Sequence, residues 1–107
     1  MNRGDIWYVD LGGRVGRRPV VVLSRQTVLD YLNKITVVEV TTRDKGYPTE
    51  VFIGTGGNLP TPSFVQADNI HTVPKQRLVK YSGTLDAATM VKVSRKVVLA
   101  LGLEEAG

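Results

Sequence analysis

The sequence predicts a mainly β protein with a C-terminal helix, built as a small, strongly bent sheet or partly open barrel. The chain has 107 residues, which fits a single domain over residues 1–107. Its apolar residues form short runs separated by Gly, Pro and Asp, and the last long run repeats with the period of a helix. The runs predicted to be strands are residues 6–9, 20–23, 35–42, 49–53, 63–67, 69–73 and 79–83.

The composition of each run indicates how its strand is buried. Residues 6–9 are Ile-Trp-Tyr-Val, and residues 20–23 are an uninterrupted apolar run after Pro19, which is typical of a strand buried on both faces. Residues 35–42 are the longest stretch rich in β-branched side chains. Residues 49–53 alternate between polar and apolar side chains, so we expect one face of that strand to be solvated.

Two short helical segments are expected between strands. Residues 25–32 are predicted to form a short helix because Ser24 can act as its N-cap. Pro74, at the first position of residues 74–77, predicts a single helical turn before the last strand.

The C-terminal helix has the clearest pattern. Thr84 or Asp86 can cap its start, and Gly102 stands where a left-handed glycine ends a helix. The apolar positions that repeat on one helical face are Met90, Val93, Val97 and Leu101.

Composition excludes several classes of protein and site. With 42% apolar and 22% charged residues, the chain is globular rather than disordered. It has no Cys and one His, so thiolate chemistry, disulfides and Cys-rich or His-rich metal sites are excluded, and we expect no cofactor. The 14 Lys and Arg residues outnumber the 10 Asp and Glu residues, and the net charge of +4 favours a polyanionic partner.

Nothing in the sequence points to a membrane. The first residues are polar and lack the apolar segment of a signal peptide. No run approaches the ~18 apolar residues that a spanning helix needs. We therefore expect no membrane partner and a cytoplasmic location.

Three polar segments are candidates for chemistry. Residues 12–19 combine glycines with arginines, which suits phosphate binding but also a solvated hairpin connection. Residues 41–48 begin with two threonines, which either end a strand or present hydroxyls beside Arg18. In the third segment Asp68 is a candidate general base and His71 a candidate acid or base, although a lone His is more often incidental.

Taken in order, these segments resemble the MazF/PemK family of toxin endoribonucleases. Residues 4–11 and 18–24 resemble the family's opening, Thr41 to Val51 its second block, and residues 66–78 its third. The resemblance implies an SH3-like β-barrel with a C-terminal helix, of the MazF/CcdB-like kind, assembled as a homodimer. It also implies metal-independent, sequence-specific cleavage of single-stranded RNA and neutralisation by a cognate antitoxin.

The resemblance further implies that the substrate's own 2′-hydroxyl is the nucleophile, leaving a 2′,3′-cyclic phosphate and a 5′-hydroxyl. By position, the family's catalytic arginine falls on Arg18 and its catalytic threonine on Thr41. The chemistry of these side chains agrees, because a guanidinium stabilises the charge that develops on the phosphate oxygens. The Thr41 hydroxyl can donate a hydrogen bond but is too weakly basic to be the sole base.

The loop over residues 12–17 departs from the family pattern. Several relatives carry a Ser-Glu pair there whose glutamate is a proposed base, whereas this loop has no carboxylate. Either Asp68 is the base, at the floor of the same groove, or electrostatic stabilisation alone carries much of the rate. The side chains expected to bind RNA are Arg17, Thr42, Arg43, Lys45 and Gln66.

The expected substrate is mRNA, with rRNA and tRNA as further candidates. The expected partner is a MazE-like antitoxin whose acidic, disordered tail folds into a groove of the homodimer and covers Arg18. Operator DNA would be bound only by the complex with the antitoxin. Two alternatives remain: a CcdB-like toxin that acts on DNA gyrase without nuclease activity, and a non-catalytic nucleic-acid-binding barrel.

Overall fold

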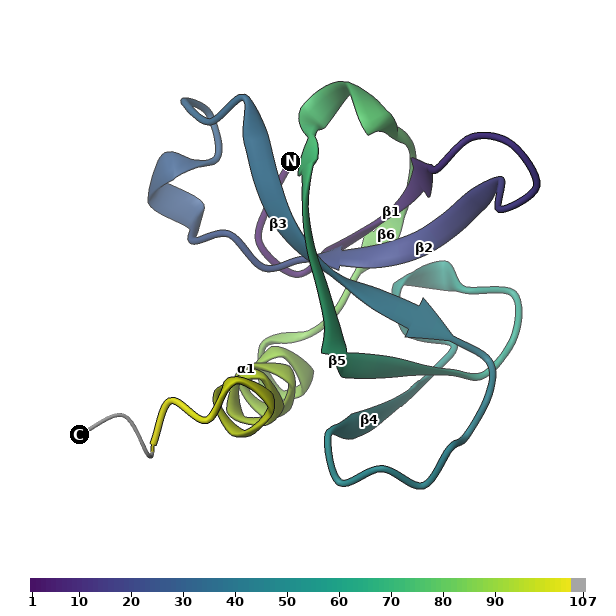
Figure 1. Ribbon diagram of the computed structural model, residues 1–107, viewed down its shortest axis with the longest axis vertical. Coiled ribbons are helices and arrows are strands. Elements are labelled where there is room, and N and C mark those ends of the chain that lie inside the picture. Colours follow the sequence, from purple (N-terminus) through teal and green to yellow (C-terminus); the bar gives the residue numbers. More distant parts are fainter. Residues whose placement is uncertain (105–107) are drawn as a thin grey trace.

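The computed structural model describes residues 1–104. Six strands form one antiparallel sheet in the order β4-β5-β3-β2-β1-β6, and one helix packs against it (Figure 1). The elements are β1 (Asp5–Asp10), β2 (Arg17–Val22), β3 (Lys34–Thr41), β4 (Glu50–Gly54), β5 (Ser63–Pro74), β6 (Leu78–Thr84) and α1 (Ala87–Leu101). The predicted class, mainly β with a C-terminal helix on a bent, open sheet, is confirmed.

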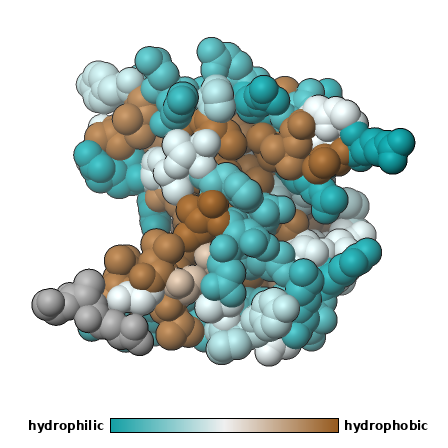
Figure 2. All heavy atoms as spheres, in the orientation of Figure 1, coloured by the Kyte–Doolittle hydropathy of each residue, from teal (hydrophilic) through white to brown (hydrophobic). Residues whose placement is uncertain are grey.

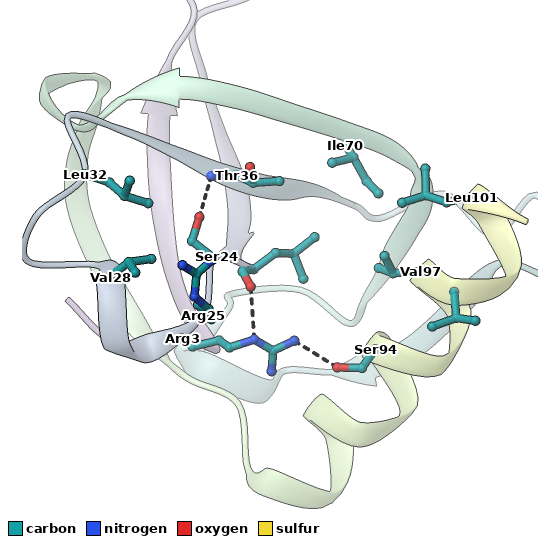
Figure 3. A pocket seen from close by; sticks show the side chains of 12 residues that line it. Arg3, Ser24, Arg25, Val28, Leu32, Thr36, Ile70, Ser94, Val97 and Leu101 are labelled. Carbon is teal, nitrogen blue, oxygen red and sulfur yellow. Dashed lines mark hydrogen bonds between the residues drawn. The ribbon is translucent and has the colours of Figure 1, made fainter. Parts of the chain in front are cut away.

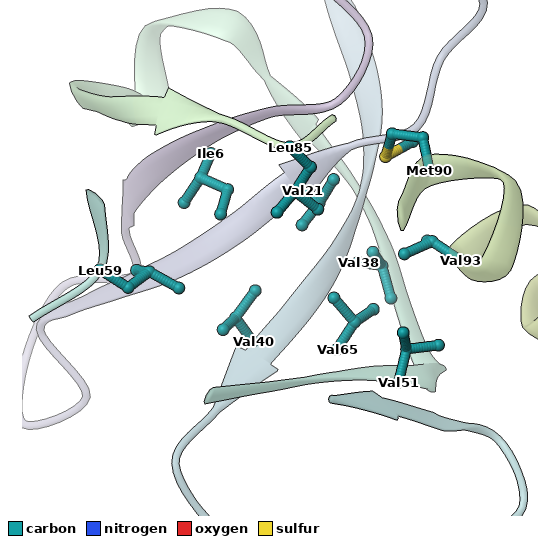
Figure 4. Packing of buried hydrophobic residues seen from close by; sticks show 10 residues of the cluster. All are labelled: Ile6, Val21, Val38, Val40, Val51, Leu59, Val65, Leu85, Met90 and Val93. Atoms are coloured by element: carbon teal, nitrogen blue, oxygen red, sulfur yellow. The ribbon is translucent and has the colours of Figure 1, made fainter. Parts of the chain in front are cut away.

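Apolar side chains cover both faces of the central strands. On the side of α1 lies the helix-side core (Figure 4), which consists of Ile6, Val21, Val38, Val40, Val51, Leu59, Val65, Leu85, Met90 and Val93. On the other side lies the outer core, which consists of Val9, Val20, Val22, Leu29, Ile35, Val37 and Leu78. Val21 belongs to the first core and Val20 to the second, so the prediction that this strand is buried on both faces is confirmed.

Strand β5 replaces two predicted strands. Residues 63–67 and 69–73 form one strand, and its pairing with β3 jumps from Ile70 opposite Val38 to Gln66 opposite Glu39. The extra residues at 67–69 form a bulge, and because a bulge bends its strand, β5 turns sharply there (Figure 1). The first part of β5 can therefore pair with β4 while the second part follows β3.

The predicted helix over residues 25–32 is wrong, because the structure has only a 3₁₀ turn at Gln26–Val28. Its expected cap is used elsewhere: the Ser24 hydroxyl oxygen accepts from the backbone N–H of Thr36 on β3, at 2.8 Å. An isolated helical segment this short has little intrinsic stability. The single turn predicted after Pro74 is present as a 3₁₀ turn at Lys75–Arg77.

Helix α1 begins and ends as predicted. Asp86, not Thr84, is its N-cap, and the Asp86 carboxylate accepts from the backbone N–H of Thr89 at 2.7 Å. Gly102 adopts the left-handed conformation at φ 65°, and the N–H of Leu103 returns to the carbonyl of Val98. No helix in the described part of the chain has the length and apolar character needed to cross a membrane.

Candidate active site

A polar cleft of about 530 Å³ opens where β2, β3 and β5 meet the loop after β3. Its lining consists of Arg18, Pro19, Glu39, Val40, Thr41, Thr42, Arg43, Lys45, Ser63, Gln66 and Asn69. The structure therefore brings together all the predicted site residues except Arg17, Asp68 and the candidate His71.

The pairing of β2 with β3 sets the relation between the predicted catalytic residues. Val20 lies opposite Glu39 in this antiparallel ladder. The pairing ends there; Arg18 precedes Val20 by two residues, Thr41 follows Glu39 by two residues, and both side chains line the cleft. Side chains two residues apart on a strand point to the same face. Arg18 and Thr41 therefore lie on the face of the outer core, beyond its last valines.

The glycine-containing loop between β1 and β2 delivers Arg18 to this position. The loop closes through the N–H of Leu11, which donates to the carbonyl of Gly16 at 3.0 Å. Gly16 has φ 66°, a conformation that other residues rarely adopt. Arg17 follows directly, opposite Asp10, and its exposed side chain does not line the cleft.

The loop between β3 and β4 carries two cations over the cleft and is held by side-chain oxygens. The Thr41 hydroxyl accepts from the N–H of Arg43 at 3.2 Å. The Glu50 carboxylate accepts from the N–H of Lys45 and from that of Tyr47, each at 3.1 Å. These bonds fix the backbone from which Arg43 and Lys45 extend.

Gln66 is a buried polar residue in the lining of the cleft. It lies opposite Glu39 on β3 and opposite Glu50 on β4. Its side-chain oxygen accepts from the Asn69 amide at 2.9 Å, which fixes the orientation of the Gln66 amide. Hydrogen-bonding groups held in this way suit the recognition of a nucleobase edge.

Asp68 lies outside the cleft. It is exposed on the bulge of β5, and its carboxylate accepts from the Thr49 hydroxyl at 2.5 Å. Asp68 therefore does not line the cleft that Arg18 and Thr41 share, although it is next to the cleft residue Asn69 in the sequence.

The charges of the cleft are mostly uncompensated. In residues 1–104 the only contact at salt-bridge distance between a basic and an acidic side chain joins His71 Nε2 to Glu39 Oε2, at 2.7 Å. Arg18, Arg43 and Lys45 therefore have no carboxylate partner within that part of the chain and are available to a phosphate backbone.

The sequence analysis did not identify Glu39 as a residue of the cleft. The available signal was its position, because Glu39 is the single charged residue within an otherwise β-branched stretch and lies two residues before Thr41. Sequence reasoning also grouped His71 with Asp68, whereas the structure pairs His71 with Glu39. Among the residues that the structure describes, no three His, Cys, Asp or Glu side chains are grouped as metal ligands.

A second hollow lies between α1 and the segment after β2, and apolar side chains gather around it (Figure 2). This apolar groove has a volume of about 500 Å³, and its apolar lining consists of Leu23, Val28, Leu32, Ile70, Val97, Val98 and Leu101. Arg3 crosses its floor, donating to the Leu23 carbonyl at 3.0 Å and to the Ser94 hydroxyl at 2.9 Å (Figure 3). Arg3 thus links helix α1 to the segment after β2, and the groove above it remains open to solvent.

The chain is similar to proteins of one known family. Residues 2–101 match the model of the PemK-like, MazF-like toxin of type II toxin–antitoxin systems. The chain is 34% identical to the endoribonuclease MazF1 of Mycobacterium bovis over 101 residues, covering 94% of this chain and 92% of the relative.

Solved structures with the same fold are also related in sequence. A mycobacterial endoribonuclease in complex with its cognate antitoxin superposes with a TM-score of 0.86 at 32% identity, covering 96% of both chains. The Mycobacterium tuberculosis toxin MazF-mt6 superposes with a TM-score of 0.83 at 31% identity, covering 92% of this chain and 96% of the toxin. The match along nearly the whole chain, together with the shared fold, shows that this protein belongs to the PemK-like, MazF-like toxin family of type II toxin–antitoxin systems.

Proposed function

We propose that this chain is the toxin of a type II toxin–antitoxin system and that it cleaves single-stranded RNA in the cytoplasm, without a metal ion. It is a MazF-like endoribonuclease, as its curated relatives are named. The observation that supports the site of cleavage is that Arg18 and Thr41 line one cleft, whose cations have no carboxylate partner at salt-bridge distance in the described chain.

In this proposal the RNA 2′-oxygen attacks the adjacent phosphorus, and the bond from phosphorus to the 5′-oxygen breaks. Negative charge develops on the non-bridging phosphate oxygens during attack. The Arg18 guanidinium remains charged near neutral pH and donates two parallel hydrogen bonds to those oxygens, which stabilises the transition state. The Thr41 hydroxyl donates to a phosphate oxygen or orients the 2′-hydroxyl. The products carry a 2′,3′-cyclic phosphate and a 5′-hydroxyl.

The remaining cleft residues bind the RNA on either side of the scissile phosphate. Arg43 and Lys45 neutralise flanking phosphates, since their backbone is held over the cleft by Thr41 and Glu50. Thr42 and Gln66 offer hydrogen-bonding groups to an unstacked base, which gives the cleavage its sequence preference. Arg17, outside the cleft, contributes to long-range attraction of the polyanion. The substrate is mRNA, with rRNA or tRNA as further substrates.

Two protein partners complete the proposal. The apolar groove leaves Leu101 and Leu32 partly exposed, and burying them against a second copy of the chain stabilises a homodimer. A MazE-like antitoxin with an acidic tail then binds across the basic cleft, covers Arg18 and competes with RNA. Operator DNA is bound only by that complex.

The decisive experiment uses purified protein and total RNA in the presence of EDTA, with the new 5′ ends mapped by sequencing. Cleavage at a recurring short sequence, with cyclic-phosphate ends and loss of activity in Arg18→Ala, is expected. A gyrase-directed toxin or a non-catalytic binding barrel of the same fold would leave the RNA uncut and would exclude the proposal.

A further inference from the structure

We propose that Glu39 is the general base that removes the proton from the attacking 2′-hydroxyl, and that His71 is the positioning residue that holds its carboxylate. This inference rests on the proposed function. It assigns a catalytic residue that lies on a sheet strand rather than in the loop over residues 12–17 or at Asp68.

The first argument is that Glu39 is placed where a base is needed and other carboxylates are not. Among the described residues, Glu39 is the one carboxylate that lines the cleft. The loop over residues 12–17 has none, and Asp68 is exposed on the bulge of β5 with an oxygen bonded to Thr49. Glu50 is occupied as well, because its oxygens accept from the backbone of the loop after β3.

The second argument is the spacing on the sheet. Glu39 and Thr41 are neighbours on one face of β3, about 7 Å apart along the strand. Glu39 lies directly opposite Val20, which is two residues from Arg18 on β2, and Arg18 and Glu39 line the same cleft. A phosphate bound between Arg18 and Thr41 therefore places its neighbouring ribose within reach of the Glu39 carboxylate.

The third argument is the contact with His71, at 2.7 Å between Nε2 and Oε2. Since an ionised carboxylate has no proton to give, Nε2–H donates and holds Oε2, leaving Oε1 for the substrate. The Glu39 side chain is 29% exposed and that of His71 is 52% exposed, so the pair connects the cleft with bulk water. The other charged groups facing the cleft are Arg18 from β2 and Arg43 and Lys45 from the loop after β3.

The proton and electron movements balance without a cofactor. The 2′-hydroxyl proton passes to Glu39 as the bond from the 2′-oxygen to phosphorus forms. The bond from phosphorus to the 5′-oxygen breaks, and its electron pair leaves on that oxygen, which takes a proton from water. Glu39 then returns its proton to solvent, and His71 resets the carboxylate by donating to it again.

The test measures single-turnover cleavage of a defined RNA against pH. Glu39→Gln keeps the shape but cannot accept the proton, so we expect the rate at neutral pH to fall by about 100-fold or more. The part of the profile in which the rate rises with pH as the base deprotonates should disappear. Binding of a substrate analogue with a 2′-deoxy scissile nucleotide should change by no more than a few-fold.

The matched control is Asp30→Asn, which removes an exposed carboxylate that does not line the cleft, and its rate should equal that of the wild type.

His71 is tested by two substitutions that differ in hydrogen bonding. His71→Ala should lower the rate about tenfold while leaving binding of the 2′-deoxy analogue within a few-fold of the wild type, because the Glu39 carboxylate loses the donor that holds it. His71→Gln retains an N–H donor and should recover most of the rate. Equal loss of rate in both variants would show a merely structural role for His71.

Failure of this inference is distinguishable from failure of the proposed function. If Glu39→Gln cleaves RNA like the wild type while Arg18→Ala does not, the nuclease assignment stands and Glu39 is not the base. If Asp68→Asn alone removes the rising part of the profile, the base is Asp68. Should Glu39→Gln not fold, as judged by circular dichroism, Glu39→Asp replaces it. We then expect partial activity that keeps the wild-type form of the profile, and full wild-type activity would contradict the inference.

Discussion

Arg18 on β2 and Thr41 on β3 both line the polar cleft, each two residues beyond the paired Val20 and Glu39. The outer core ends before these positions, so the same face of the sheet is apolar at Val20 and polar at the cleft. The same β-strand alternation that buries Val20 and Val37 therefore aims the guanidinium and the hydroxyl at one volume.

Removing the guanidinium should abolish RNA cleavage without unfolding the protein. Arg18 is exposed and outside both cores, so Arg18→Ala should leave the thermal unfolding midpoint within about 2 °C of the wild type. Loss of the charge that stabilises the phosphate oxygens should lower the single-turnover rate by about 100- to 1,000-fold. Arg18→Lys should restore part of this rate, because an ammonium keeps the charge but loses the paired donors. Equal cleavage by Arg18→Ala and wild type would remove Arg18 from the mechanism.

Removing the threonine hydroxyl should have a smaller effect. Thr41→Val keeps the shape of the side chain but loses the donor to substrate and the acceptor for the N–H of Arg43. We expect the rate to fall by roughly tenfold, as for the loss of one hydrogen bond worth about 1.5 kcal/mol. Thr42→Val is the matched control, and a larger loss there than in Thr41→Val would transfer the role to Thr42.

The parts of the fold that depend on local pattern were predictable from the sequence. The apolar run of β2 and the spacing of Met90 and Val93 in α1 depend on neighbours along the chain. The helix over residues 25–32 was predicted wrongly because its proposed cap, Ser24, bonds to a residue on β3 that is distant in sequence. The pattern of neighbouring residues cannot show that a distant backbone group takes the hydrogen bond of a proposed cap.

The same distinction applies to the site. Arg18 stands just before one predicted strand and Thr41 near the end of another, so their meeting required only that the two strands be neighbours. The bulge of β5 was not predictable, and it decides which residues of that strand reach the cleft. It exposes Asp68 and leaves His71 beside Glu39, so the carboxylate facing the cleft differs from the one that the sequence suggested.

Cations of the loop after β3 should act mainly through RNA binding. Lys45→Ala removes one phosphate contact but no group proposed for the chemical step. It should weaken binding of uncleavable RNA and reduce the salt dependence of the logarithm of affinity by about 0.7 for the single strand. Fluorescence anisotropy across a salt series measures both quantities. An unchanged slope would place Lys45 outside the path of the RNA.

The apolar groove should control the oligomeric state. Leu101 lines it and is 56% exposed, whereas Leu99 on the same helix is 51% exposed and does not line it. Leu101→Glu places a charge on the proposed contact with the second copy and should shift sedimentation toward the monomer. Leu99→Glu is the matched control and should retain the dimer. Dissociation by both variants to the same extent would show that the groove is not the contact.

The N-cap of α1 should make stability depend on pH in the acidic range. The pKa of Asp86 is lowered from its ordinary value of 3.8, chiefly by the hydrogen bond from the backbone N–H of Thr89. A hydrogen bond from the Thr89 side chain and the positive charge of Lys92 lower it further. Because the folded-state pKa lies below the unfolded one, the charged cap stabilises the fold above that ordinary value. This contribution is lost as pH falls through the folded-state pKa.

Asp86→Asn keeps a capping oxygen without the charge, so its deficit in unfolding free energy should be present at pH 7 and vanish in strong acid. Asp86→Ala, which has no capping oxygen, should remain less stable than the wild type at both pH values. Urea unfolding of the three proteins at several pH values measures these differences, and an Asp86→Asn deficit that did not change with pH would show that the carboxylate charge contributes nothing to the cap.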